Sequence, residues 1–167
     1  MPIALYRIDD RLIHGQVVVG WGQPLNIGFI ILVDDEVACC DWEMDLYRMG
    51  VPPEMQITFA TVATAIRDHA MYAADPRRGI IVVPDIATMK RLIDGIPYIK
   101  EVNVGGIHHR AGRIQKLRYV FLAPDEELQL RTIAEKGIRV TAQDVPAARV
   151  VPVTEILGPP PAEIRSA

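Results

Sequence analysis

Four side chains with acid–base or anion-binding chemistry stand close together near the start of the chain, in the segment RIDDRLIHGQ. Asp9 and Asp10 are adjacent, Arg11 follows them directly, and His14 comes three residues later. An imidazole can act as a nucleophile or a base near neutral pH, and a guanidinium binds the oxygens of phosphate or carboxylate groups. The combination favours a site that holds a negatively charged, reactive group such as a phosphoryl group.

Each of these residues also has a purely structural explanation. Asp9 and Asp10 can be turn residues whose carboxylates bind their own backbone, and Arg11 can pair with either of them at the surface. A single histidine beside a turn, such as His14, is more often a surface or capping group than a reactive one. Residue types and spacing alone therefore leave both explanations open.

Short apolar runs bounded by turn residues predict the strands that would position this segment. These runs are residues 3–8, 29–33, 56–60, 80–83, 101–104, 119–122 and 138–141. Helical spacing of apolar residues follows at 63–70, 86–93 and 128–136. The alternation predicts an α/β fold, a single domain with an open, mainly parallel sheet covered by helices on both faces.

In such a sheet, ligands bind outside the carboxyl ends of the strands. His14 and its neighbours follow the first predicted strand, and Gly105 and Gly106 follow the fifth. If HGQVVVGW begins a helix, a phosphoryl group on His14 would meet free backbone N–H groups and a favourable dipole, and Gly15 would let the backbone approach closely. The helix itself is weakly predicted, because two glycines and three valines are poor helix formers.

Other aspartates at strand ends are assigned to helix capping. Asp35, Asp85 and Asp125 each follow an apolar run, and Thr61 precedes a helical segment. Aspartate and threonine are favoured N-cap residues, so these four positions need no catalytic explanation. The glycine-rich and basic stretch 105–118 is predicted to be a loop or an irregular hairpin, and 150–157 a last strand or an extended arm.

The remaining histidines and the tryptophans are interpreted structurally. His108 and His109 are followed by an arginine, but adjacent side chains in an extended loop point apart, so structural or partner-contact roles are favoured over a shared metal. His69 falls on the polar face of a predicted helix and is expected to be solvated. Trp21 and Trp42 are expected to be packing anchors rather than stacking platforms.

Composition excludes several classes of protein. The 167 residues carry a formal net charge of −3 with a pI of about 5.8, which argues against nucleic-acid binding. No apolar run is long enough to span a bilayer, and the first residues lack a signal peptide's features, so a cytoplasmic protein is expected. Cys39 and Cys40 are adjacent, which favours neither a disulfide nor a zinc site. The proline-rich residues 158–167 are expected to be a flexible tail after a domain at 1–157.

The segment YRIDDRLIHGQVVVGW, residues 6–21, resembles the opening motif of the IIB components of the mannose–fructose–sorbose class of the bacterial sugar phosphotransferase system. The resemblance continues in order along nearly the whole chain. It includes IILVDDEVA at 30–38, TVATAI at 61–66, MKRLIDGI at 89–96, VNVGGI at 102–107 and EKGIRVTAQDVP at 135–146. After VNVGGI this chain has HHRAGR, where the family more usually has an apolar or aromatic pair before a basic residue and a glycine.

The resemblance implies both a fold and a function. The fold would be a mainly parallel, seven-stranded open sheet with helices on both faces. The protein would be a cytoplasmic phosphocarrier that acts transiently at the inner face of the plasma membrane. A IIA protein, phosphorylated on its own histidine, would pass the phosphoryl group to Nδ1 of His14, and the group would then go to a sugar bound by the membrane subunits IIC and IID. No cofactor and no metal is implied.

The resemblance also implies roles for individual residues. His14 must be neutral to attack phosphorus; a helix N-terminus would favour the neutral ring, whereas nearby aspartates would favour the charged one. Arg11 would stabilise the charge of the transferring group. One aspartate, Asp10 in preference to Asp9, would orient the ring. The predicted phosphate-binding residues are Gly15, Gln16, Gly105 and Gly106.

Two other functions remain open at this level. A regulatory protein of the same system would use phosphorylation of His14 to change its contacts with another protein rather than to feed a transporter. A histidine phosphatase is disfavoured, because those enzymes have Arg-His-Gly after the first strand and here Ile13 precedes His14. The sugar and the oligomeric state cannot be deduced from the chain.

Overall fold

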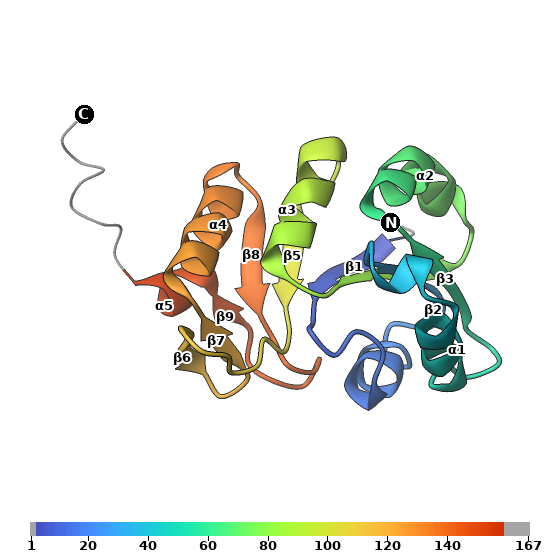
Figure 1. The fold of residues 1–167 in the computed structure, drawn as a ribbon, viewed down its shortest axis with the longest axis horizontal. Helices are drawn as coiled ribbons and strands as arrows, with labels where there is room; N and C mark the ends of the chain where they lie inside the picture. Colours follow the sequence, from blue (N-terminus) through green and yellow to red (C-terminus); the bar gives the residue numbers. More distant parts are fainter. Residues whose placement is uncertain (1–2, 159–167) are drawn as a thin grey trace.

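Seven strands form one sheet in the order β3-β2-β4-β1-β5-β8-β9 in the computed structural model, which describes residues 3–158 (Figure 1). Every neighbouring pair is parallel except β8 with β9, which is antiparallel. The bounds are Ile3–Ile8 (β1), Ile27–Val33 (β2), Gln56–Ala60 (β3), Arg78–Val83 (β4), Glu101–Val104 (β5), Arg139–Ala142 (β8) and Val151–Pro152 (β9). The predicted α/β class and mainly parallel sheet are confirmed.

One predicted strand lies outside this sheet. The run at 119–122 forms β7 (Val120–Leu122), which pairs with β6 (Ile114–Leu117) in a separate antiparallel hairpin. The irregular hairpin predicted for 105–118 is therefore present, but it ends in β7. The seventh strand of the main sheet is β9, and the chain continues from it as the short helix α5 (Val153–Leu157).

Helices cover both faces of the sheet, as predicted. One hydrophobic cluster joins the sheet to α2 (Val62–Ala74), α3 (Ile86–Gly95) and α4 (Pro124–Glu135). A second cluster joins the other face to η1 (Gln16–Trp21), η2 (Val37–Cys39) and α1 (Asp41–Met49). Helix α1 was not predicted, and none of its side chains is fully buried.

The two tryptophans differ in their environments. Trp21 is buried on the face covered by η1, so the packing role predicted for it is confirmed. Trp42 lies on α1 with 68% of its surface exposed, so the same prediction for Trp42 is wrong. The reason is that α1 rests on the sheet through other residues, including Met44 and Tyr47.

The capping predictions are mostly confirmed. Thr61 accepts a hydrogen bond from the backbone N–H of Thr64, and Asp85 accepts one from Thr88. Asp35 accepts from the N–H of Val62 and so satisfies the first turn of α2 from another segment. The prediction for Asp125 is wrong, because α4 begins one residue earlier, at a proline. The carboxylate of Glu126 bonds the backbone N–H of Ala123 instead.

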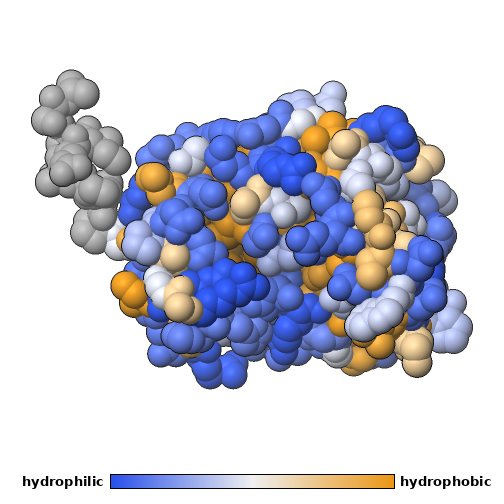
Figure 2. Space-filling model, in the orientation of Figure 1, coloured by the Kyte–Doolittle hydropathy of each residue, from blue (hydrophilic) through white to orange (hydrophobic). Residues whose placement is uncertain are grey.

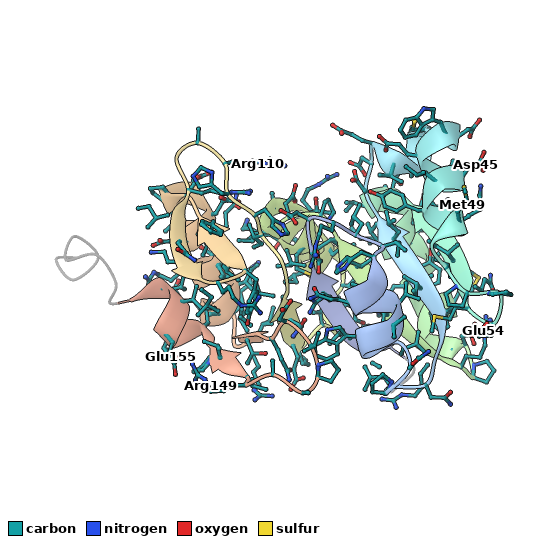
Figure 3. The ribbon with its side chains drawn as sticks, turned by 90° about the horizontal axis from the view of Figure 1, so that it is seen from below. Asp45, Met49, Glu54, Arg110, Arg149 and Glu155 are labelled. Atoms are coloured by element: carbon teal, nitrogen blue, oxygen red, sulfur yellow. The ribbon has the colours of Figure 1, made fainter. Side chains whose placement is uncertain are left out.

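The sheet reverses its winding direction beside β1. From β1 the chain runs outward to β2 and β3, returns through β4, and then passes over β1 to β5 and β8. The loops after β1 and β5 therefore diverge at neighbouring strand ends, and open α/β sheets bind ligands in the crevice formed there. Figure 3 shows the molecule from below, with Arg110 labelled in the loop after β5 and Asp45 and Met49 labelled on α1.

The surface drawn in Figure 2 is mainly hydrophilic, with hydrophobic side chains exposed between polar ones. Within residues 3–158, no helix has the length and hydrophobicity needed to cross a bilayer. Residues 159–167 of the predicted tail lie outside the described part of the chain.

Candidate functional site

The chain turns sharply after β1 and brings His14 back toward Asp9. A carboxylate oxygen of Asp9 accepts a hydrogen bond from the backbone N–H of Arg11 at 3.1 Å, and its carbonyl accepts one from Leu12 at 3.0 Å. Leu12 has a φ of 57°, a left-handed conformation that is costly for a branched side chain. Burial of the Leu12 side chain offsets that cost, so the turn holds a fixed, strained geometry next to His14.

Asp9 fixes the orientation and the tautomer of His14. Nε2 of His14 lies 3.0 Å from Oδ2 of Asp9. An ionised carboxylate can only accept, so Nε2 carries the proton and Nδ1 keeps its lone pair. Nδ1 accepts a hydrogen bond from the backbone N–H of Gln16 at 3.3 Å. Because 16% of the His14 side chain is exposed, the unprotonated nitrogen belongs to a ring that a partner can reach.

The orienting residue is thus Asp9, whereas the sequence favoured Asp10. Asp9 is fully buried, and its carboxylate lies against His14 and the guanidinium of Arg7. The carboxylate of Asp10 bonds the backbone N–H and the ring Nδ1 of His108 instead. The two adjacent carboxylates therefore bind different imidazole rings.

Arg7 was not predicted from the sequence to be a site residue, but its buried side chain binds Asp9 on the interior side of the site. Its side chain is completely buried, and all five of its N–H donors are used. Two bond Oδ2 of Asp9, at 3.3 and 3.1 Å; the others bond Oδ1 of Asn103 and the carbonyls of Gln143 and Asp144. The guanidinium also lies 5.3 Å from the ring centre of Trp21. A charged residue inside a strand buried on both faces was the sequence signal for this role.

Asp9 and Arg7 form a buried ion pair, and the carboxylate of Asp9 also contacts His14. Burial by itself would raise the pKa of Asp9, but the hydrogen bond from His14 and the charge of Arg7 outweigh it and lower that pKa below its usual range. Burial lowers the pKa of Arg7, although arginine stays protonated in proteins. The ionised carboxylate of Asp9 therefore lies directly against Nε2 of His14.

Arg11 provides a second, accessible cation beside the ring. Its Nη2 donates to the side-chain oxygen of Gln16 at 2.6 Å, and its Nε lies 3.7 Å from Oδ1 of Asp9. The Arg11 side chain is 41% exposed, so part of the guanidinium faces solvent. Arg11, Gln16 and His14 therefore form a small surface on which an anion can be bound next to Nδ1.

The two glycines after β5 allow close approach to this cluster. A Cβ on Gly105 would lie 2.4 Å from the guanidinium of Arg7, which leaves no room for any side chain. A Cβ on Gly106 would come within 3.4 Å of Asp9 and 3.6 Å of Arg11. Gly105 thus packs on the buried arginine, and Gly106 lies at the rim beside the exposed one.

The segment after His14 is a six-residue π-helix, η1, that follows Gly15. The N–H of Gly22 bonds the carbonyl of Val17, five residues back. Glycine and valine are poor helix formers, which explains why a longer α-helix does not form here. A helix of this length has a small dipole, so the strong dipole expected at His14 is absent, and anion binding depends on Arg11 and on individual N–H groups.

Among the described residues, no group of histidines, cysteines and carboxylates is arranged to hold a metal ion. His108 and His109 point apart, as predicted: His108 bonds Asp10, and the ring of His109 packs edge-on against Phe121 at 5.7 Å. Cys39 and Cys40 are both free thiols.

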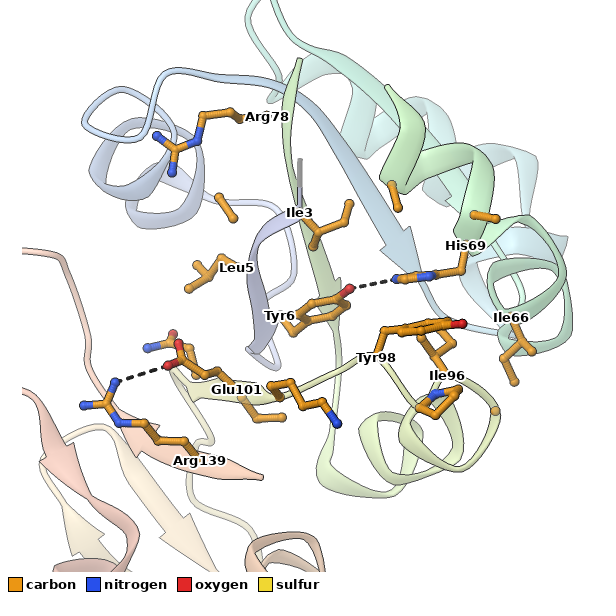
Figure 4. Close-up of a pocket in the computed structure, with 18 of the residues that line it drawn as sticks. Ile3, Leu5, Tyr6, Ile66, His69, Arg78, Ile96, Tyr98, Glu101 and Arg139 are labelled. Carbon is orange, nitrogen blue, oxygen red and sulfur yellow. Dashed lines mark hydrogen bonds and ion pairs between the residues drawn. The ribbon is translucent and has the colours of Figure 1, made fainter. Parts of the chain in front are cut away.

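A large cleft lies at the opposite edge of the sheet from His14. The cleft shown in Figure 4, about 1270 Å³, opens between the amino ends of β1 and β5. In it the hydroxyl of Tyr6 lies 2.7 Å from Nε2 of His69. His69 is buried, so the prediction that it is solvated is wrong; α2 turns this residue toward the sheet. The cleft is remote from His14, and its size does not make it the reactive site.

The fold and site together define an α/β protein whose unprotonated histidine nitrogen lies beside arginine at the switch point of a parallel sheet. The family model described as the PTS system sorbose subfamily IIB component matches residues 3–163, and the chain belongs to this family of the phosphotransferase system. The resemblance inferred from the sequence is therefore confirmed.

Individual relatives agree with this assignment. The chain is 34% identical over 148 residues to the N-acetylgalactosamine-specific phosphotransferase enzyme IIB component 1 of Escherichia coli K12, covering 86% of this chain and 91% of that protein. It is 33% identical to the mannose-specific EIIAB component of the same strain and spans 45% of that longer protein. The crystal structure of the IIBSor domain of the sorbose permease of Klebsiella pneumoniae matches with a TM-score of 0.85 at 26% identity, covering 93% of this chain and 96% of the other.

Proposed function

We propose that this IIB component is a phosphocarrier that accepts a phosphoryl group on Nδ1 of His14 and passes it to a sugar. The observation that supports the proposal is the hydrogen bond from Nε2 of His14 to Asp9, since it leaves Nδ1 unprotonated, with a lone pair that accepts only the 3.3 Å contact from the backbone N–H of Gln16. The donor is a IIA protein phosphorylated on histidine, and the acceptor is a sugar bound by the membrane subunits IIC and IID. The protein acts in the cytoplasm, at the inner face of the membrane.

The first step is a displacement at phosphorus. The lone pair on Nδ1 of His14 forms a new N–P bond while the N–P bond to the donor's histidine breaks, and the donor ring keeps that electron pair. Since Nε2 still carries its proton, the phosphorylated ring becomes a cation. The buried carboxylate of Asp9 lies against that proton and stabilises the positive charge.

The same arrangement favours the second step. A phosphorylated imidazole that is protonated on its other nitrogen is a good leaving group, because it departs as a neutral ring. A sugar hydroxyl then forms an O–P bond while the N–P bond to His14 breaks; the hydroxyl proton passes to a base at the sugar site of the membrane subunits, and His14 returns to its starting tautomer. Asp9 therefore assists both steps, the transfer to His14 and the transfer from it, by holding one proton on Nε2 throughout.

Arg11 binds the oxygens of the group in transit. Its guanidinium is permanently charged, partly exposed and held beside the ring by Gln16 and Asp9. Phosphoryl transfer depends mainly on positioning and charge stabilisation, which a fixed guanidinium provides. The comparisons name sugar-specific components, and no contact in the described residues favours the regulatory alternative over transfer to a sugar.

The test is to mix the protein with its phosphorylated IIA partner. Phosphate should label the wild type, and the label should be acid-labile and base-stable, as for phosphohistidine. His14→Ala should remove the label, whereas His109→Ala, which changes an exposed imidazole on the adjacent loop, should retain it. Label that survives His14→Ala would overturn the assignment.

A further inference from the structure

A second histidine, His108, lies next to His14, and an aspartate holds it by its other ring nitrogen. His108 is in the loop after β5, and its Nδ1 lies 2.6 Å from Oδ1 of Asp10. The backbone N–H of the same residue donates to Oδ2 of Asp10 at 2.7 Å. The carboxylate thus binds Nδ1 of His108, whereas Asp9 binds Nε2 of His14. In His108 the nitrogen left free is Nε2.

The ring of His108 is half exposed, yet its backbone is fixed. Arg113 donates to the carbonyl of His108 at 2.7 Å and makes two bonds to Glu126, at 2.7 and 2.8 Å. Arg113 and Glu126 are mostly buried, and Glu126 also bonds the backbone at the start of α4. These contacts connect the loop to a helix of the core, so the position of His108 does not depend on Asp10 alone.

Gly106 shows how close this ring is to the reactive cluster. A Cβ at Gly106 would lie 3.1 Å from Cε1 of His108, 3.4 Å from Oδ1 of Asp9 and 3.6 Å from Nη2 of Arg11. One carbon-sized space therefore separates the His108 ring from the carboxylate behind His14 and from the guanidinium beside it. Cε1 is bonded to both ring nitrogens, so Nε2 is adjacent to the atom that faces this space.

We propose that His108 is a further phosphoryl-binding residue of this site, which donates a hydrogen bond from Nε2 to an oxygen of the phosphoryl group. The proposal rests on the phosphocarrier function of His14. In the bound state both ring nitrogens of His108 carry a proton, the second one taken up from solvent; Nδ1–H donates to Asp10 and Nε2–H donates to the phosphoryl oxygen. The charged groups around it are Asp9, Asp10, Arg11 and Arg113, and the phosphoryl group adds two negative charges on the side of Nε2.

This role gives the rim a second cation that complements Arg11. A group bound by two cations from different loops is held at two oxygens and so has one orientation. His108 belongs to the HHRAGR segment in the loop after β5.

The experiment separates a phosphoryl contact from a structural contact with Asp10. In size, the amide nitrogen of asparagine replaces Nδ1 of histidine and that of glutamine replaces Nε2. His108→Asn therefore keeps the bond to Asp10 and loses the outward donor, whereas His108→Gln does the reverse. His109→Asn is the matched control, because that ring packs on Phe121 instead.

Phosphoramidate, a small chemical donor, is used to phosphorylate His14 in the full chain without a partner protein. We expect His108→Asn to be phosphorylated about tenfold more slowly than the wild type, the loss of one charge-assisted hydrogen bond. We expect His108→Gln to recover most of the rate and His109→Asn to equal the wild type. The ³¹P resonance of phospho-His14 should shift in the asparagine variant and stay nearly unchanged in the glutamine variant.

Two outcomes would overturn the proposal. If His108→Asn matches the wild type in rate and in ³¹P shift, the ring does not touch the phosphoryl group. If His108→Asn is normal and His108→Gln is slow, His108 only positions Asp10. Both results require that His14 is labelled. The absence of any label on His14 would contradict the phosphocarrier function itself, so the two failures are distinguishable.

Discussion

Two histidines, His14 and His69, are each held by one hydrogen bond to a residue in or just after β1, at opposite edges of the sheet. At the carboxyl edge His14 is bound to the carboxylate of Asp9 at 3.0 Å. At the amino edge His69 is bound to the hydroxyl of Tyr6 at 2.7 Å. The first ring has a fixed proton on Nε2 and an unprotonated Nδ1 that accepts a hydrogen bond from the backbone N–H of Gln16. The second ring is buried and has no charged partner among the described contacts.

The difference originates in the alternation of β1. Tyr6 and Arg7 are neighbours whose side chains point to opposite faces, one toward α2 and the other toward Trp21. On the face of Arg7 the chain buries a cation, which stabilises the ionised form of Asp9. On the other face burial acts without a charged partner for Tyr6 or His69; it raises the pKa of Tyr6 to about 12 and lowers the pKa of His69. The two histidines therefore differ in their partners: a buried carboxylate lies against His14, and a hydroxyl lies against His69.

The largest expected effect comes from removing that buried cation. Arg7→Met keeps an apolar stem of similar length but leaves Asp9 buried without its positive partner. We expect the free energy of unfolding to fall by about 3–5 kcal/mol, the usual result of breaking a buried ion pair from one side. Urea denaturation followed by circular dichroism measures the loss.

Arg11→Met is the matched control for this change. Arg11 also faces Asp9, but it is partly exposed, and such pairs contribute about 0–1 kcal/mol. A loss below 1 kcal/mol in Arg7→Met would mean that the hydrogen bonds of Arg7 do not stabilise the buried Asp9. The proposed difference between the two edges of the sheet would then be wrong.

The next effect sharpens the role of the carboxylate. Asp9→Asn keeps the size of the side chain but removes the charge behind Nε2, so the phosphorylated ring loses its counter-charge and the tautomer is no longer fixed. We expect transfer from phosphorylated IIA to slow by about a hundredfold, at the low end for loss of a proton-holding partner. Stopped-flow or quenched-flow transfer assays measure the rate.

Asp10→Asn is the control for Asp9→Asn, since its carboxylate holds His108 and not His14. Asp10→Asn should slow transfer much less than Asp9→Asn. Equal losses in the two variants would show that charge near the site matters and that the direct contact with His14 does not.

Much of the fold followed from patterns that one strand or helix shows on its own. The strands predicted at 3–8, 56–60 and 101–104 have the observed bounds, because each is a short apolar run between turn residues. Helix α1 was missed because it buries no side chain completely. The run at 119–122 was assigned to the wrong sheet, because periodicity reports that a segment is extended and says nothing about its neighbour.

The site shows the same division between local and distant information. Asp9, Arg11 and His14 were found because they are close in sequence, and the switch point placed them at the correct edge. Which aspartate faces His14 depends on Arg7, whose other partners lie near residues 103 and 144 and cannot be deduced from spacing. His69 was taken as polar and solvated because its partner, Tyr6, is 63 residues away.

The smallest expected effect tests the neutral edge through pH. Burial lowers the pKa of His69, so the folded protein resists a proton that the unfolded chain accepts below about pH 6.5. Since the unfolded state then binds more protons, stability is full above this pH and falls as the pH decreases from about 6.5 toward the folded pKa. His69→Gln retains an acceptor for the Tyr6 hydroxyl and cannot titrate, so its free energy of unfolding should vary less between pH 7 and 5. Urea unfolding at each pH compares the two chains, and parallel curves would mean that His69 takes up its proton equally well in the folded protein, which would remove the distinction between a charged edge and a neutral one.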